Sequence, residues 1–331
     1  MFIKIVVKKD SSVLGYPGEI SKALNADHHN ICKFDSPKDP NYIAVRNVLI
    51  SLINKIISTN RSSIPILSNP RESRELRSLL AINESPDADF IFFRDQWAQG
   101  TSGWILKDEI FLQWLQVREP TPDIHLLWLN GGAATGKSVL SSFVINSLVE
   151  KGHHCQYFFL RFGDQKKRTL SMLLRSIAYQ IAQSLPDFSR SVVELVNEAI
   201  DFENTSPRAI WERIFKSIFF NLKERQPLYW IIDGIDEADE PKAVIKTLSD
   251  IAACSVPLRI LLVSRKTPEI SASLERVPER FKLATISIEG HVEDLRCYIR
   301  QELSMPGGAE FKERIAAQIV EGAENNFLVS F

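Results

Sequence analysis

The chain has 331 residues, and its 44% hydrophobic and 24% charged content is typical of a globular protein and too apolar for a disordered chain. Its 40 lysines and arginines against 41 aspartates and glutamates give a formal net charge of −1, so no global positive field attracts nucleic acid or an anionic membrane. No apolar run reaches the length of about 18 residues that a membrane-spanning helix needs, and the 4 cysteines form no CxxC pair, so we expect a reduced, cytoplasmic protein.

The first 60 residues predict a small region with one clear helix. A single helical stripe of apolar residues runs through Val45, Val48, Leu49, Leu52, Ile53 and Ile56. Residues 61–89 are rich in serine, asparagine, proline and arginine, a composition typical of a linker that carries at most one short helix. We expect residues 90–123 to form a helical lead-in to the region that follows.

From residue 124 onward, short apolar runs alternate with helical stripes. The stripes cover 170–181 and 210–222, and the second begins with a serine cap followed by proline at Ser206-Pro207. Such alternation predicts a parallel sheet with helices on both faces, in an α/β domain of roughly 170 residues. Two more helices are expected around 291–303 and 309–321. The runs that predict strands are 125–130, 156–160, 228–233, 258–264 and 284–288.

The first strand leads into the sequence Gly-Gly-Ala-Ala-Thr-Gly-Lys-Ser at 131–138, and a helix follows. This is the P-loop pattern G-x-x-x-x-G-K-[ST] between the two elements it requires, and its backbone N–H groups bind phosphate oxygens. Lys137 is expected to reach the β- and γ-phosphates, and Ser138 to ligate Mg²⁺. The alternative is a glycine-rich turn that merely caps a helix. The predicted nucleotide contacts are Gly131, Gly132, Ala133, Ala134, Thr135, Gly136, Lys137 and Ser138.

A second group of polar residues follows the strands at 228–233 and 258–264. Asp233 ends an apolar strand and fits the Walker B role, in which a carboxylate holds Mg²⁺ together with Ser138. Asp236 and Glu237 follow it and could orient or deprotonate the attacking water, or could belong to a solvated acidic turn. Arg265 ends the next strand and could contact the γ-phosphate, or could be an ordinary surface arginine.

In the order of these motifs along the chain, the sequence resembles the NACHT-type STAND NTPases, specifically the NLR-like proteins of fungi. The resemblance implies a P-loop NTPase with a three-layer α/β/α fold and a mainly parallel five-stranded sheet, plus partial helical segments at both ends. It covers about residues 90–331, and the stretches that carry it are 101–106, 111–115, 127–140, 157–159, 173–176, 233–237 and 262–265.

The resemblance implies a signal-transduction switch of the kind found in innate immunity and heterokaryon incompatibility, with ADP bound at rest and ATP bound when assembled. Slow Mg²⁺-dependent hydrolysis would reset it. Carried over residue by residue, the family pattern gives magnesium to Ser138 and Asp233, catalysis to Asp236 or Glu237, and sensing to Arg265. The Trp104 region would either lie near the adenine or belong to the core.

Two departures from the family pattern affect what we expect. Ala133 and Ala134 stand where the family often has Pro-Gly, and this alters the loop backbone if a positive φ is needed there. At the sensor, Val263 and Lys266 replace the outer residues of the usual Thr-Ser-Arg-Pro. These departures put turnover in doubt more than nucleotide binding.

The N-terminal region carries a second resemblance. Residues 24–34 and 39–42 look like the C-terminal end of an α/β-hydrolase (lipase-like) domain, in which His28 would match the triad histidine. The chain has no G-x-S-x-G nucleophile motif, so we interpret His28 as part of a remnant and not as a catalyst. The domain boundaries that we expect are 1–60 for this remnant, 61–89 for the linker, 90–123 for the lead-in, 124–289 for the NACHT core and 290–331 for the start of a truncated helical domain.

Three functions compete at this point. The first is an ATP- or GTP-binding switch NTPase, with ATP as the expected nucleotide, ATP/ADP and Mg²⁺ as cofactors, and self-association or partner proteins engaged through regions outside this sequence. The second is an interaction module that binds nucleotide without turnover, or a truncated fragment without function. The third, a small-molecule kinase, fits the acid turn and Arg265 poorly. If the helical domain is truncated, we expect weak binding and fast exchange of nucleotide.

Overall fold

The computed structural model describes residues 34, 36, 39, 41–49, 70–116, 124–196, 202, 204–251, 254–289, 292–302 and 309–323. The chain divides into two units, Met1–Ser63 and Ile64–Phe331. In the first unit a helix covers 41–49. Asp39 precedes this helix, and its side chain accepts a hydrogen bond from the backbone N–H of Asn41. The rest of the predicted N-terminal stripe and the predicted hydrolase remnant around His28 lie outside the described residues.

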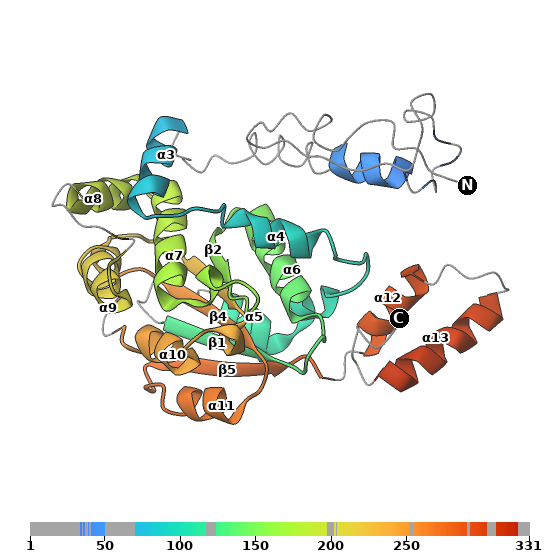
Figure 1. Cartoon of the computed structure of the whole chain (residues 1–331). Coiled ribbons are helices and arrows are strands. Elements are labelled where there is room, and N and C mark those ends of the chain that lie inside the picture. The colour runs from blue at the N-terminus through green and yellow to red at the C-terminus, as the bar shows by residue number, and fades with distance from the viewer. Residues whose placement is uncertain are drawn as a thin grey trace. The chain divides into compact units, whose positions relative to one another are not determined.

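The second unit contains a five-stranded sheet in which every pairing is parallel (Figure 1). The strand order is β2-β3-β4-β1-β5, so β1 lies between two strands that come much later in the chain. Each strand overlaps one of the predicted apolar runs, so the predicted α/β fold with a parallel five-stranded sheet is confirmed. The strands are β1 (Ile124–Asn130), β2 (His154–Phe159), β3 (Leu228–Asp233), β4 (Leu258–Ser264) and β5 (Phe281–Ser287).

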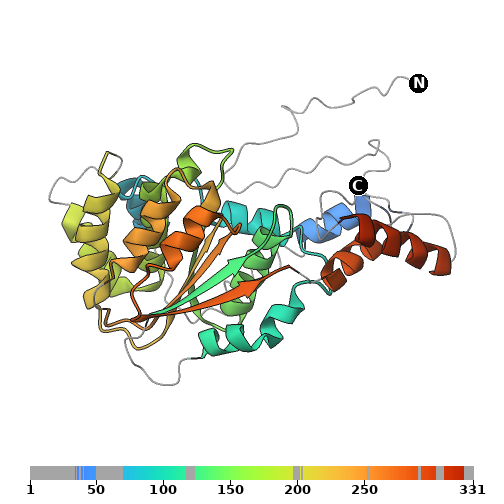
Figure 2. The ribbon, with the colours of Figure 1, turned by 90° about the horizontal axis from the view of Figure 1, so that it is seen from below.

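Two hydrophobic cores lie on the two faces of the sheet, because successive side chains of a strand point to opposite faces. On β3, for example, Trp230 and Ile232 belong to one core, and Tyr229 and Ile231 to the other. Helices cover both faces, which completes the predicted three layers (Figures 1 and 2). One layer contains α4 (Asp87–Arg94), η1 (Gly103–Lys107), α5 (Glu109–Leu115) and α6 (Lys137–Glu150).

The opposite layer contains the longest helix of the core region, α7 (Leu170–Ser184), which the stripe at 170–181 predicted. Two further helices, α12 (Val292–Glu302) and α13 (Ala309–Ala323), pack on each other through Leu295, Ile299 and Ala316. Their ranges agree with the two predicted C-terminal helices. The other helices of the opposite layer are α3 (Pro70–Leu79), α8 (Pro186–Val196), α9 (Pro207–Ile210), α10 (Pro241–Ser249) and α11 (Pro268–Leu274).

The structure differs from the sequence-based expectation at two places. The predicted helix at 210–222 starts at its Ser206 cap but becomes a π-helix over Trp211–Lys216, and the N–H of Ser217 reaches back to the carbonyl of Glu212. In the predicted linker, Leu76, Leu80 and Ile82 are buried in the core, so this stretch helps to hold the second unit together. No helix within the described part of the chain has the length and hydrophobicity that crossing a membrane requires.

Candidate nucleotide-binding site

The phosphate loop joins the carboxyl end of β1 to the first residue of α6. Gly136 adopts a left-handed φ of 78° at the helix N-cap, a conformation that glycine allows without strain. A Cβ on Gly131 would lie 2.9 Å from the Thr135 hydroxyl and 3.2 Å from Cβ of Ile288. The glycines of the motif therefore stand where the backbone turn and the close packing require them.

Ala134 occupies a position that normally suits glycine. Its φ is +53°, in the left-handed region, whereas Ala133 is not among the residues with positive φ. A left-handed conformation costs a residue with a Cβ about 1–2 kcal/mol. The loop thus keeps its bend despite the substitution of Pro-Gly by Ala-Ala, and the strain falls on one residue.

Lys137 starts α6, and its ammonium group folds back over the phosphate loop. Nζ donates to the carbonyl oxygen of Gly131 at 3.1 Å and also to that of Gly132. Burial lowers the pKa of the Lys137 ammonium, and the neighbouring Asp233 carboxylate opposes this shift. The cation is therefore held at the mouth of the loop by weak carbonyl partners that phosphate oxygens could replace.

Asp233, at the end of β3, connects the acid group of the site to the phosphate loop. Its Oδ2 accepts the Ser138 hydroxyl at 2.6 Å, and its Oδ1 accepts the Ser141 hydroxyl at 2.8 Å. Asp233 is 3% exposed, and burial raises the pKa of its carboxyl to about 6, although both serine hydroxyls favour the ionised form. Ser141 was not predicted from the sequence, but it lies three residues after Ser138 and so on the same face of α6.

The pair Ser138–Asp233 fits a magnesium ion. Mg²⁺ prefers oxygen ligands and keeps several waters, and proteins hold it through one or two side chains together with substrate phosphates. A hydroxyl and a carboxylate meet beside the phosphate loop, as such a site requires. Within the described residues, no group of three or more His, Cys, Asp or Glu side chains gathers as a metal cage.

The acid turn, residues 233–240, begins with a tight bend at Gly234. Gly234 has a φ of +76°, and a Cβ there would lie 2.4 Å from the backbone oxygen of Leu160 at the end of β2. No other residue fits this position without moving the backbone. The bend brings Asp236 and Glu237 to the same edge of the sheet as the phosphate loop.

Asp236 and Glu237 have different partners in the structure. The Asp236 carboxylate accepts the backbone N–H of Arg265 at 2.8 Å and pairs with its guanidinium Nε at 2.9 Å. Glu237 instead accepts the backbone N–H of Phe162 through Oε2 at 2.8 Å. Asp236 thus orients Arg265, whereas the bond from Phe162 occupies only one of the two carboxylate oxygens of Glu237.

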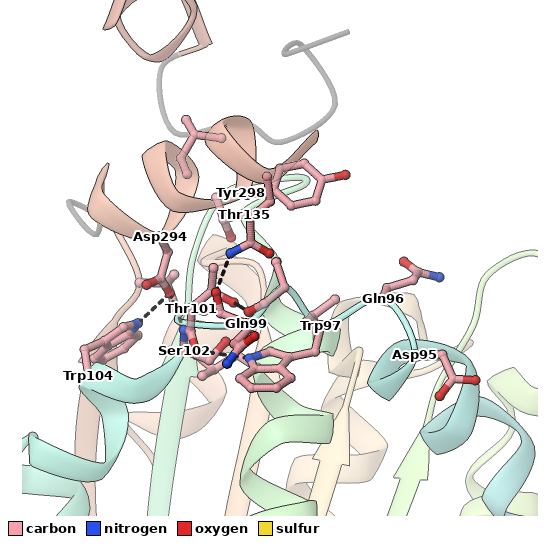
Figure 3. A pocket seen from close by; sticks show the side chains of 17 residues that line it. Asp95, Gln96, Trp97, Gln99, Thr101, Ser102, Trp104, Thr135, Asp294 and Tyr298 are labelled. Carbon is pink, nitrogen blue, oxygen red and sulfur yellow. Dashed lines mark hydrogen bonds between the residues drawn. The ribbon is translucent and has the colours of Figure 1, made fainter. Parts of the chain in front are cut away.

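A cavity of about 430 Å³ adjoins the phosphate loop at Thr135 and Gly136 (Figure 3). Its wall combines apolar and polar groups, as small-molecule sites do, and its volume suits a ligand of nucleoside size. It is lined by three separate segments, which lie within 95–104, 135–140 and 288–301. The segment 135–140 includes the end of the phosphate loop, so a ligand in the cavity would lie beside the phosphate site.

Asp294 on α12 joins two walls of this cavity. Its Oδ2 accepts the backbone N–H of Ser102 at 2.7 Å and the indole Nε1–H of Trp104 at 3.1 Å (Figure 3). Trp97 lines the opposite part of the wall, packs on Phe143 with ring centroids 5.6 Å apart, and donates its Nε1–H to the Thr101 carbonyl. Trp104 itself lines the cavity and packs against the core, as one of the two alternatives for it predicted.

Sequence comparison places most of this site within one known family. The sequence model of the family described as "Nephrocystin 3, N-terminal" matches residues 100–265, which is half of the chain. The vegetative incompatibility protein HET-E-1 of Podospora anserina is 26% identical over 198 residues, and the matched region is 58% of this chain and 14% of that protein. The chain therefore spans a small part of the curated relative.

Structural comparison finds distant similarities. The Aeropyrum pernix ORC1 protein in complex with DNA is 14% identical with a TM-score of 0.42, and the alignment covers 76% of this chain and 61% of that one. Drosophila ORC bound to AT-rich DNA and Cdc6 is 14% identical with a TM-score of 0.36, over 70% of this chain and 34% of that one. These TM-scores are too low to support an argument about fold or function.

Proposed function

The chain belongs to the nephrocystin 3 N-terminal family, and we propose that it is a NACHT-type switch that binds ATP and hydrolyses it slowly with Mg²⁺. The region that matches the family includes the phosphate loop and Asp233. The family and the fold make the chain a nucleotide-binding P-loop NTPase. The observation that supports the proposal best is the meeting of Lys137, Ser138 and Asp233 beside a cavity of nucleoside size.

Each group of the site then has a role that its geometry supports. The N–H groups of the phosphate loop and Lys137 bind the phosphates, and Thr135 and Gly136 join them to the cavity where we place the adenosine. A bound Mg²⁺ would neutralise charge on the β- and γ-phosphates, with Ser138 and Asp233 as its protein ligands. Glu237 orients or deprotonates the attacking water, and Arg265, oriented by Asp236, contacts the γ-phosphate.

The biological context of the switch is also a proposal. The relative in Podospora anserina is named for vegetative incompatibility, and we propose that this chain acts in the same kind of non-self response. Because the chain spans 14% of that relative, assembly and signalling would also depend on regions beyond the matched part.

Release of inorganic phosphate by the purified protein tests this proposal. We expect slow release that requires ATP and Mg²⁺, loss of nucleotide binding in Lys137→Ala by about 100-fold, and loss of release with binding retained in Glu237→Gln. Two exposed residues supply matched controls, Lys151→Ala at the far end of α6 and Glu240→Gln, which should behave like the wild type. A protein that binds no nucleotide with Lys137 intact would contradict the proposal.

A second candidate function, nucleotide binding without turnover, is favoured by one observation. Both acids of the turn already have partners in the protein, Arg265 for Asp236 and the Phe162 N–H for Glu237. On this alternative, the wild type and Glu237→Gln bind nucleotide with the same affinity, and neither protein releases phosphate. The same phosphate assay therefore distinguishes the two functions.

A further inference from the structure

The segment that follows β2 makes a tight turn against the acid turn. The N–H of Asp164 bonds the carbonyl of Arg161 at 3.1 Å, which defines a β-turn with Phe162 and Gly163 in its centre. The N–H of Phe162 points out of this turn and donates to Oε2 of Glu237 at 2.8 Å. Phe162 is 71% exposed, and the one contact of its ring that bears on the loop is with the Arg168 guanidinium, which lies 5.1 Å from the ring centre.

A buried carboxylate on another element anchors both ends of this segment, which we call the β2 loop (residues 160–168). Asp89 on α4 is 8% exposed, and it binds Arg161 through Oδ1 at 2.8 Å and Lys167 through Oδ2 at 2.8 Å. The Arg161 guanidinium also lies over the ring of Phe93, 5.1 Å from its centre. Since paired buried charges are costly to break, α4 fixes where the β2 loop lies.

The β2 loop is also joined directly to the acid turn. Arg168 pairs with Asp239 through Nε at 3.1 Å, and the Asp239 N–H donates to the Arg168 carbonyl at 3.0 Å. Gly234 presses against Leu160 at the start of the loop. These contacts fix the position of the β2 loop relative to the acid turn, and so the position of the Phe162 N–H relative to the Glu237 carboxylate.

We propose that the β2 loop positions Glu237 for water activation, and that Asp89 is the positioning residue that anchors the loop. The inference rests on the proposed hydrolytic function. A carboxylate with one oxygen held by a rigid N–H presents its other oxygen in a defined direction, and such preorganisation lowers the activation barrier of the step it assists. Asp89 lies outside the family match at 100–265, so the anchor comes from the stretch that the composition assigned to a linker.

Replacing Phe162 by proline removes the hydrogen bond to Glu237, together with the ring that lies under Arg168. Proline suits the second position of a turn such as this one, and Gly163 in the third position has no positive φ that the exchange would disturb. We expect kcat for phosphate release to fall about tenfold in Phe162→Pro, with the KM for ATP and the affinity for ADP within about twofold of the wild type. Phe162→Ala loses the same ring but keeps the N–H, so the fall in kcat of Phe162→Pro relative to Phe162→Ala measures the hydrogen bond alone.

A second pair of variants tests the anchor. Asp89→Asn should lower kcat by a similar factor, because it breaks the two ion pairs that join the β2 loop to α4, and Lys167 then keeps only its pair with Glu84. Asp87→Asn alters the same helix but disturbs the bond from Tyr157 on β2, not the loop, and should keep kcat. Both Phe162→Pro and Asp89→Asn should keep the KM for ATP and the affinity for ADP within about twofold of the wild type, so that the loss falls on kcat alone, which a merely structural effect would not explain.

The possible outcomes distinguish a failure of this inference from a failure of the proposed hydrolytic function. A wild type without phosphate release contradicts the proposed function and the inference together. Release that needs Lys137 and Glu237 but is unchanged in Phe162→Pro contradicts the inference alone, as does a rise of kcat, which would show that the bond restrains Glu237. If Asp89→Asn does not fold, the Phe162→Pro and Phe162→Ala pair still decides.

Discussion

The two sides of the candidate site are built in different ways. The phosphate side, residues 131–141, is one continuous stretch in which Lys137 bonds the backbone of the same loop, and Ser138 and Ser141 join it to Asp233. The acid side consists of the acid turn and the β2 loop, and its contacts join residues as far apart as Asp89 and Lys167. Because phosphate binding is local and the acid side depends on distant partners, we expect mutations to affect affinity and turnover separately.

The largest effect is expected on the acid side, at Gly234. Gly234→Ala combines a left-handed φ with a Cβ placed 2.4 Å from the Leu160 backbone oxygen, and should lower the free energy of unfolding by about 3 kcal/mol. On the phosphate side, the Cβ added in Gly131→Ala would meet the side chains of Thr135 and Ile288, which can move, so its cost should be smaller.

Urea unfolding of the two glycine variants checks this order. Gly163→Ala is the control, because nothing lies within 4 Å of an added Cβ and its φ is not left-handed. A Gly234→Ala variant that is no less stable than Gly163→Ala would contradict the close contact between the acid turn and the β2 loop.

Asp233, which joins the two sides, should give an intermediate effect with a defined pH dependence. Its folded pKa of about 6 lies above the ordinary value of 3.8, so the folded protein loses stability as the pH rises between these values. Without nucleotide, Asp233→Asn should therefore be about 2 kcal/mol more stable than the wild type at pH 7.5 and equal to it near pH 4.

Unfolding in urea at the two pH values, without Mg²⁺, measures this difference. Asp187→Asn, on the exposed surface of α8, should change stability by less than about 0.5 kcal/mol at both. A wild type that is as stable as Asp233→Asn at pH 7.5 would show that the Asp233 carboxyl is not destabilised by its burial.

The smallest effect is expected on the phosphate side, at Ala134. Ala134→Gly removes the strain of a φ of +53° and should stabilise the protein by up to about 1 kcal/mol, after the entropy that glycine loses on folding. The adjacent Ala133→Gly has no such strain to remove and should destabilise by about 0.5–1 kcal/mol. In thermal unfolding, the two variants should change the stability in opposite directions if the loop has this conformation, and in the same direction if it has not.

The sequence predicted most of the fold and the phosphate side for a physical reason. The strands are continuous apolar runs because both faces of the sheet are buried, and the phosphate loop is a motif because its backbone geometry needs glycines at fixed spacing. The π-helix at Trp211–Lys216 could not be predicted, since a broad apolar stripe fits an α-helix equally well.

The remaining parts of the site depend on contacts that the sequence does not mark. The donor to Glu237 is a backbone N–H, which any residue except proline would supply in the place of Phe162. Asp294 meets Ser102 and Trp104 across 190 residues or more, and no local pattern identifies such a pair. Asp89 stands in a stretch that the composition assigned to a linker, and only its burial between two cations indicates its importance.

The strand order also determines how the site can form while the chain is being synthesised. β2 and β3 are neighbours in the sheet and can pair as soon as Asp233 has left the ribosome. β1, in contrast, pairs with β4 and β5, so the earliest strand of the sheet must wait for the two latest. Long-range parallel pairing of this kind is slow. A nascent chain would thus acquire the acid side first, and nucleotide could assist its folding only after β4 has emerged.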